Sequence, residues 1–368
     1  MGTGIKTNTN TLFALAEIGQ SPWYDNIDRR FIKNGELKKI FDNGILGVTS
    51  NPTIFEKAVS ASDVYDEMIK KLSGDGKSVP EIYDILTRED VSMAADLLKD
   101  TYKKTGCLDG YVSIEVLPEY AHDAEKTIES AREIFKKIQK PNIMIKVPGT
   151  KEAPEAIRAL TREGLNVNVT LLFSVKHYET CAKAYTEGLK DRLKEGKDIK
   201  NVFSVSSIFV SRIDTKLDKI FGERKENELA GRIAVANSKM IYQKFKEIFN
   251  CNDFNSLKTK GANMQRVLWA STSTKNPSYN DVKYVEELIG PDTINTMPPV
   301  TIDAFLDHGK VAVTVENDLD GEKAYLDKLK TLGIDIERVC QEIQDAGVTA
   351  FQNSFDKLIR SIESKIYT

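Results

Sequence analysis

The sequence predicts an α/β protein whose strands close into a (β/α)8 TIM barrel, with extra helices at the C-terminus. Short apolar runs alternate with amphipathic helical stretches, which is typical of βαβ units and a parallel sheet. Eight such units fit within roughly 300 residues, a usual size for a closed barrel. The alternative is an open doubly wound sheet, but the sequence contains neither of the glycine-rich phosphate loops typical of that fold.

The first half of the chain supplies four expected strands, at 20–25, 44–51, 111–117 and 142–148. Pro52 ends the second strand, because proline has no amide hydrogen to donate to a ladder. Residues 1–10 are polar and are expected to be mobile. Helices are expected between the strands, at 11–18, 35–41, 61–104 in two or three pieces, and 121–139.

The second half supplies the other four strands, at 166–173, 202–209, 266–271 and 293–297. The connecting helices are expected at 153–163, 175–194, 212–221, 226–249 and 281–289. The remainder reads as mainly helical, apart from a β-branched patch at 311–315, and Gly333 separates the last two helices. We expect residues 1–368 to form one barrel domain, with 310–368 as a mainly helical C-terminal extension.

The composition excludes several classes of function. The chain of 368 residues has a net charge of −3 with acids and bases interspersed, so nucleic acid is not an expected partner. No 18-residue apolar run or leader-like start occurs, so no membrane association is expected. Four scattered cysteines and three histidines give no metal-ligand spacing, so no metal is expected, and they suit the reducing cytoplasm.

Lys146 is the most informative residue, because it lies in the strand at 142–148 among apolar neighbours. An unpaired buried charge is costly, and a buried lysine relieves that cost by losing its proton, which makes it a nucleophilic amine. Taken alone, a lysine near a strand end more often extends its charge to water. The neighbouring strands therefore decide between these readings.

Polar residues occur toward the ends of five expected strands. On the strand at 166–173, Asn168 and Thr170 share one face, while valines and a leucine take the other. The C-terminal rim of a barrel is where active sites form, and so many buried polar groups are most simply explained by a shared cavity. The sequence therefore predicts a site built from Asp25, Asn51, Glu115, Lys146, Asn168 and Thr170.

Three motifs give the chain a resemblance to the transaldolase family over about residues 20–300. They are Gly-Val-Thr-Ser-Asn-Pro-Thr-Ile-Phe at 47–55, Ile-Lys-Val-Pro-Gly-Thr at 145–150, and Gly-Leu-Asn-Val-Asn-Val-Thr-Leu-Leu-Phe-Ser at 164–174. The chain length and the run Trp-Ala-Ser-Thr-Ser-Thr-Lys at 269–275 resemble the longer bacterial-type subgroup. The resemblance implies a (β/α)8 barrel that needs no cofactor.

The resemblance also implies an activity in the pentose phosphate pathway. A dihydroxyacetone unit passes from a ketose phosphate (sedoheptulose 7-phosphate or fructose 6-phosphate) to an aldose phosphate (glyceraldehyde 3-phosphate or erythrose 4-phosphate). By the same resemblance, Lys146 forms a Schiff base, Asp25 exchanges a proton with the C4 hydroxyl, and Glu115 acts through a water held by Thr170. Asn51, Asn168 and Ser207 would hold the hydroxyls of the three-carbon unit.

The phosphate end departs from the shorter members of the family. Arg212 matches the family's phosphate-binding arginine, and guanidinium groups suit phosphate. On the seventh strand Ser271 is present, but Ser273 stands where shorter members have a second arginine. Lys275 either supplies the missing charge or is a solvated loop residue.

Two other functions stay open. A lysine-dependent fructose 6-phosphate aldolase would release free dihydroxyacetone, and such relatives tend to have glutamine at position 115 and tyrosine at position 209. Glu115 and Phe209 therefore favour transfer. A non-catalytic sugar-phosphate-binding barrel is the third possibility, although pure binding needs no nucleophilic lysine. Whether the chain is a monomer or a homodimer is not determined by the sequence.

Overall fold

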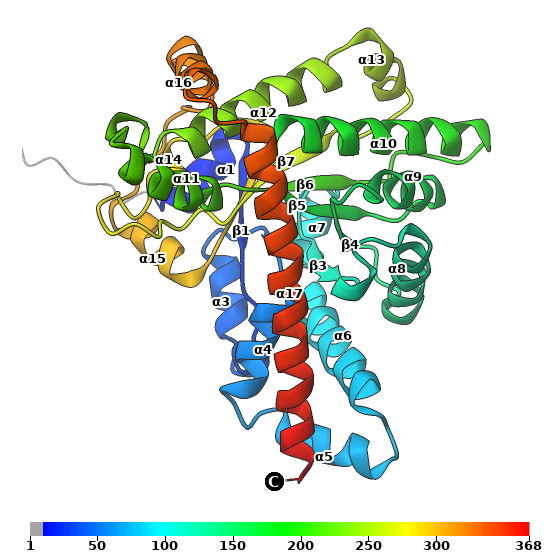
Figure 1. Cartoon of the computed structure of the whole chain (residues 1–368). Helices are drawn as coiled ribbons and strands as arrows, with labels where there is room; N and C mark the ends of the chain where they lie inside the picture. Colours follow the sequence, from blue (N-terminus) through cyan, green and yellow to red (C-terminus); the bar gives the residue numbers. More distant parts are fainter. Residues whose placement is uncertain (1–9, 368) are drawn as a thin grey trace, which may run out of the picture.

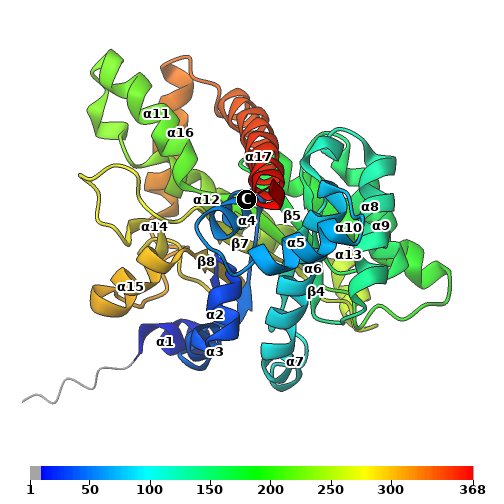
Figure 2. The same cartoon turned by 90° about the horizontal axis from the view of Figure 1, so that it is seen from below.

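The computed structural model describes residues 10–367, and eight parallel strands within them form a closed barrel in the order β1 to β8 (Figures 1 and 2). This arrangement confirms the predicted (β/α)8 barrel and excludes the open sheet. The strands are β1 (Gln20–Tyr24), β2 (Gly47–Val48), β3 (Val112–Glu115), β4 (Ile143–Pro148), β5 (Val167–Leu172), β6 (Ser204–Phe209), β7 (Gln265–Ala270) and β8 (Thr293–Met297).

Helices surround the strands and form the outer layer of the barrel (Figure 2). None of the helices in residues 10–367 has the length and apolar character that crossing a bilayer requires. The α-helices are α1 (Thr11–Ile18), α2 (Arg29–Lys33), α3 (Glu36–Asp42), α4 (Pro52–Ser60), α5 (Asp66–Gly74), α6 (Val79–Leu97), α7 (Lys99–Lys104), α8 (Ala124–Ile138), α9 (Ala153–Glu163), α10 (Val175–Lys194), α11 (Ser211–Arg224), α12 (Ile233–Phe249), α13 (Asn252–Lys258), α14 (Lys283–Glu286), α15 (Pro299–His308), α16 (Leu319–Thr331) and α17 (Ile336–Tyr367).

The second strand is shorter than predicted, and it is followed by α4, a helix that was not predicted. Asn51 ends no strand; it caps α4, its side chain accepting a hydrogen bond of 3.0 Å from the Ile54 amide. Pro52 is the first residue of α4, a position where the missing amide hydrogen costs nothing. The β-branched patch at 311–315 has no regular secondary structure. The prediction for residues 1–9 lies outside the described range.

The N-terminal end of the barrel is closed by a buried polar cluster. Asp109 lies 3.0 Å from the guanidinium of Arg266 and accepts hydrogen bonds from Ser21 and Trp23. All four side chains are buried, and each charge has a partner, as burial of charge requires. The open end is therefore the C-terminal end, where barrel active sites form.

The extra helices at the C-terminus include α17, which crosses the open end of the barrel (Figure 1). It contacts α4, α5, α6 and the end of β5. Gln344 fixes it there, because its side-chain amide donates 2.8 Å hydrogen bonds to the backbone oxygens of Gly149 and Leu171. Gly333 separates α16 from α17, as predicted. The helix thus becomes part of the wall around the barrel mouth.

Candidate active site

A cavity of about 640 Å³, here called the mouth cavity, opens at the C-terminal ends of the strands. Strand ends, α4, α11 and α17 all contribute to its wall. Asn168 and Glu115 are the two predicted site residues that do not line it. The predicted site residues that do line it are Asp25, Asn51, Lys146, Thr170, Ser207, Arg212, Ser271 and Lys275.

Lys146 lies at the base of this cavity and is only 3% exposed. Its position follows from the strand register, in which Lys146 pairs with Glu115 of β3 and Asn168 of β5. The amine Nζ donates to the Ser50 backbone oxygen at 3.1 Å and lies 3.6 Å from Glu115 Oε2. The Phe351 ring of α17 lies 5.8 Å from Nζ. The amine is thus oriented by fixed partners, and substrate can reach it from the cavity.

Glu115 stands behind Lys146, with its side chain 8% exposed. Its Oε2 is fully buried and has no hydrogen-bond partner among the described residues. Burial raises the pKa of this carboxyl to about 7, against the opposing effect of the Lys146 charge, and Asp25 adds a smaller upward contribution. A carboxyl with such a pKa can both give and take a proton near neutral pH.

Asp25 directly follows β1 and lines the mouth cavity. It accepts a 2.7 Å hydrogen bond from the Thr49 hydroxyl, which fixes the carboxylate. Burial raises its pKa, while Lys146, the Thr49 hydrogen bond and Lys275 lower it. The carboxylate is therefore a positioned proton acceptor that faces the same space as the lysine amine.

A hydrogen-bond chain lies across the strands beside Lys146. The Ser207 hydroxyl donates to Asn168 Oδ1 at 2.7 Å, and Asn168 Nδ2 donates to Ser113 Oγ at 3.0 Å. Asn168 is fully buried below the cavity floor, so its side chain orients Ser207. Thr170 Oγ1 lies on the same strand face as Asn168 and, among residues 10–367, is buried without a partner. Such an atom calls for a water or a ligand.

One end of the mouth cavity is positively charged. Arg212, Lys57 and Lys275 line it, and none of them forms an ion pair with a carboxylate in the described chain. Burial lowers the pKa of Arg212, while the pKa of Lys275 is lowered by partial burial and then by the charges of Arg212 and Lys57. Unpaired cations that repel one another favour an anion between them.

The local structure holds these cations in place. The Arg212 guanidinium lies 5.0 Å from the centre of the Phe209 ring, and Gly347 of α17 leaves the space that its Nη1 needs. Lys275 donates to the Ser273 hydroxyl at 3.0 Å. Ser271 adopts a left-handed backbone with φ of 54°, and its hydroxyl lies 3.0 Å from that of Ser211. Ser273 therefore holds the lysine that lies near Arg212.

Three residues that contact or line the site were not predicted from the sequence, namely Lys57, Phe351 and Ser50. Lys57 follows the motif at 47–55, so a helix beginning at Pro52 would have pointed to it. Phe351 comes from a helix more than 200 residues after Lys146, and nothing local marks it. Among residues 10–367, no group of three or more His, Cys, Asp or Glu side chains has an arrangement that could hold a metal ion.

The chain is similar to known proteins over nearly its whole length. The sequence model described as "Transaldolase/Fructose-6-phosphate aldolase" matches residues 22–362. "Transaldolase 2" of Nostoc punctiforme is 44% identical over 98% of both chains, and "Transaldolase" of Trichodesmium erythraeum is 44% identical over 97% of this chain and 98% of its own. "Transaldolase" of Mycobacterium tuberculosis is 40% identical over 97% of both chains. The chain therefore belongs to the transaldolase/fructose-6-phosphate aldolase family.

Proposed function

We propose that this protein is a transaldolase that passes a dihydroxyacetone unit from a ketose phosphate to an aldose phosphate through a Schiff base on Lys146. One observation carries the proposal. A buried lysine amine lies 3.6 Å from a carboxyl with a pKa of about 7, at the base of a cavity whose other end is cationic. The relatives named transaldolase support the same reaction.

The reaction begins when the Lys146 amine attacks the C2 carbonyl of the ketose phosphate. The carbinolamine then loses its hydroxyl as water, after Glu115 gives it a proton, and an iminium ion forms. Thr170 Oγ1 and Glu115 Oε2 lie on the two strands that flank β4, and both are buried without a hydrogen-bond partner among residues 10–367. A water bonded to both atoms would give each a partner and carry the proton to the adduct.

Cleavage of the C3–C4 bond needs a base for the C4 hydroxyl. Asp25 takes this proton, and the bonding electrons move into the iminium ion, which leaves an enamine on Lys146 and releases the first aldehyde. Asn51 and Ser207 line the cavity and hold hydroxyls of the three-carbon unit, with Ser207 oriented by Asn168. The acceptor aldehyde then forms the new bond, and hydrolysis frees Lys146.

The phosphate group of each sugar binds at the cationic end. Arg212, Ser271 and Lys275 contribute, and we add Lys57, which faces the same space. Lys275 supplies the positive charge that shorter members of the family have in an arginine at the position of Ser273. Within residues 10–367 Lys275 forms no ion pair with a carboxylate, and the charge of Arg212 repels its own, which supports this role over that of a solvated loop charge.

The alternative within the family is an aldolase that releases dihydroxyacetone. Incubation of the enzyme with fructose 6-phosphate alone, and again with erythrose 4-phosphate, separates the two. We expect turnover only when the acceptor is present. Equal turnover without acceptor would favour the aldolase. Absence of turnover in both would favour a non-catalytic sugar-phosphate-binding barrel.

We place the reaction in the pentose phosphate pathway and in the cytoplasm. The names of the relatives support the pathway, and the compartment is supported by the cysteines, since all four are free thiols. Sedoheptulose 7-phosphate and fructose 6-phosphate are both proposed as donors, with glyceraldehyde 3-phosphate and erythrose 4-phosphate as acceptors. Either a monomer or a homodimer would suit this site.

A further inference from the structure

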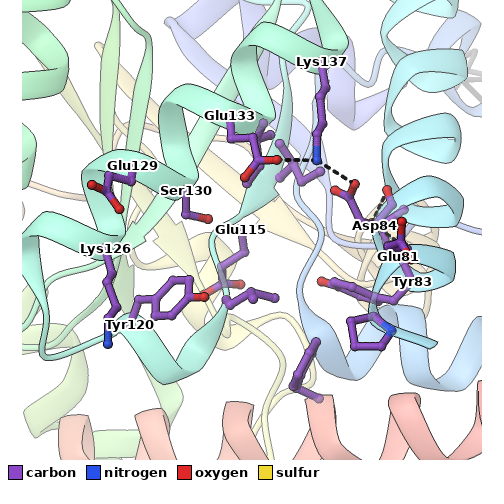
Figure 3. Close-up of a pocket in the computed structure, with 16 residues that line it drawn as sticks. Glu81, Tyr83, Asp84, Glu115, Tyr120, Lys126, Glu129, Ser130, Glu133 and Lys137 are labelled. Atoms are coloured by element: carbon purple, nitrogen blue, oxygen red, sulfur yellow. Dashed lines mark hydrogen bonds and ion pairs between the residues drawn. The ribbon is translucent and has the colours of Figure 1, made fainter. Parts of the chain in front are cut away.

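A second cavity, here called the side cavity, lies between α6 and α8 against the outer side of β3 (Figure 3). Its volume is about 350 Å³. Glu133 and Lys137 at its outer edge are exposed, so the cavity opens to solvent. Lys137 forms ion pairs with Glu133 and Asp84 from the two facing helices and holds them in place at this opening. The described part of α17 contributes Phe355, which covers one side.

Glu115 connects this cavity to the reacting lysine. The residue lines the side cavity and not the mouth cavity, while Lys146 lines the mouth cavity and not the side cavity. The two side chains meet at 3.6 Å. The Glu115 carboxyl therefore lies between the amine on one side and a cavity that opens to solvent on the other.

Polar groups line the inner end of the side cavity. Figure 3 shows Tyr83 and Tyr120 on either side of Glu115, with the Tyr83 oxygen directed toward it, and Ser130 of α8 nearby. The Tyr83 ring is held edge-on against Phe355, with centroids 5.1 Å apart. Hydroxyl groups at such positions can bind waters that lead to a carboxyl group.

We propose that the side cavity is the route by which water and protons reach Glu115 and leave it, and that Tyr83 and Ser130 are positioning residues along this route. The inference rests on the proposed Schiff-base function. Imine formation releases one water and uses one proton from Glu115, and hydrolysis of the imine consumes one water and returns the proton. A bound sugar phosphate and Phe351 cover Lys146 on the mouth side. Among residues 10–367, Glu115 lines the side cavity of about 350 Å³ and one other cavity of only about 10 Å³, so the side cavity is the roomier path to solvent.

The test fills the side cavity and measures water exchange. In H₂¹⁸O, each cycle of imine formation and hydrolysis replaces the C2 oxygen of fructose 6-phosphate with ¹⁸O, and a reaction without enzyme corrects for spontaneous exchange. For Ser130→Trp we expect the enzymatic ¹⁸O incorporation and kcat to fall together by about tenfold or more, with KM unchanged. Lys136→Trp adds the same bulk to an exposed position of α8 outside the cavity and should keep the wild-type rate.

Two further variants keep the test decisive if the tryptophan disrupts α8. Ser130→Leu fills less of the cavity and should slow both rates less. Tyr83→Phe keeps the ring contact and removes the hydroxyl, which favours the charged form of the Glu115 carboxyl. The midpoint of the pH dependence of imine formation should therefore rise, with KM unchanged. Wild-type exchange and an unmoved midpoint in folded variants would overturn the water route. Absence of a borohydride-trapped adduct in the wild-type enzyme would overturn the proposed function instead.

Discussion

The Lys146 amine lies 3.6 Å from Oε2 of Glu115, and both side chains are more than nine-tenths buried. Removal of two charges from water is costly, and no described residue donates a hydrogen bond to Oε2. The cost of burying the pair is reduced when the Glu115 carboxyl binds a proton and loses its charge. Imine formation and hydrolysis need a carboxyl that gains and loses a proton in this way. This pair is therefore the centre of the proposed mechanism.

Glu115→Gln should remove the fall in the rate of imine formation that the wild-type protein shows as the pH rises. The protonated carboxyl drives loss of water from the carbinolamine, and its pKa is about 7 in the folded protein. The protonated fraction falls as pH rises through 7, so the wild-type rate of imine formation should fall in the same window. The variant should be slower by roughly 100-fold at pH 6 and flat across this range. Rapid-quench borohydride trapping at each pH measures the rate, and a persisting limb near pH 7 would exclude Glu115 as the acid.

Lys275→Ala should weaken phosphate binding more than it slows chemistry. Loss of one charged hydrogen bond is worth about 1.5–3 kcal/mol, so KM for fructose 6-phosphate should rise by roughly tenfold or more. Steady-state kinetics measures KM and kcat separately. Lys70→Ala on α5 removes an exposed lysine away from the mouth cavity and should leave both constants unchanged. An unaltered KM in Lys275→Ala would show that Lys275 is a solvated loop residue that does not bind the phosphate.

Gln344→Ala should loosen the two strand ends that α17 holds. The substitution leaves the buried backbone oxygens of Gly149 and Leu171 without their donor, at a cost of about 1–3 kcal/mol. We expect lower unfolding free energy in urea and a lower kcat, because these oxygens follow Lys146 and Thr170. Asn353→Ala removes an exposed amide elsewhere on α17 and should change neither quantity. A fully stable and active Gln344→Ala would mean that α17 does not support the site.

Gly47→Ala should destabilise the barrel. A methyl group at Gly47 would lie 2.4 Å from the Trp23 ring, which is itself fixed by the hydrogen bond to Asp109. Such overpacking costs about 1–3 kcal/mol. Gly222→Ala within α11 is the matched control, since a methyl group there would meet no described atom within 4 Å beyond its chain neighbours and the nearby helix backbone, and it should be neutral or stabilising. Urea denaturation of both variants would show the difference, and equal stability would contradict the packing argument.

The sequence was sufficient for the barrel and for the residues that neighbouring strands bring together. Glu115, Lys146 and Asn168 could be grouped because adjacent parallel strands align their C-terminal ends, whichever register holds them. Asn51 fell in the same group although it caps a helix rather than ending a strand. A residue just after a strand and one at its end lie at the same rim.

The parts of the site that come from helix packing could not be predicted in this way. Phe351 depends on where α17 crosses the barrel mouth, and Gln344 sets that position through backbone oxygens that carry no sequence signal. The contact of Glu115 with the side cavity also depends on helix packing, because this cavity lies between α6 and α8. Strand periodicity contains no information about either.

The most direct measurement is borohydride reduction of the protein with fructose 6-phosphate, followed by peptide mass mapping. We expect a stable adduct of the three-carbon unit or the whole sugar phosphate on Lys146, and none in Lys146→Arg. An adduct on another lysine, or no adduct with the folded wild-type protein, would contradict a Schiff base on Lys146.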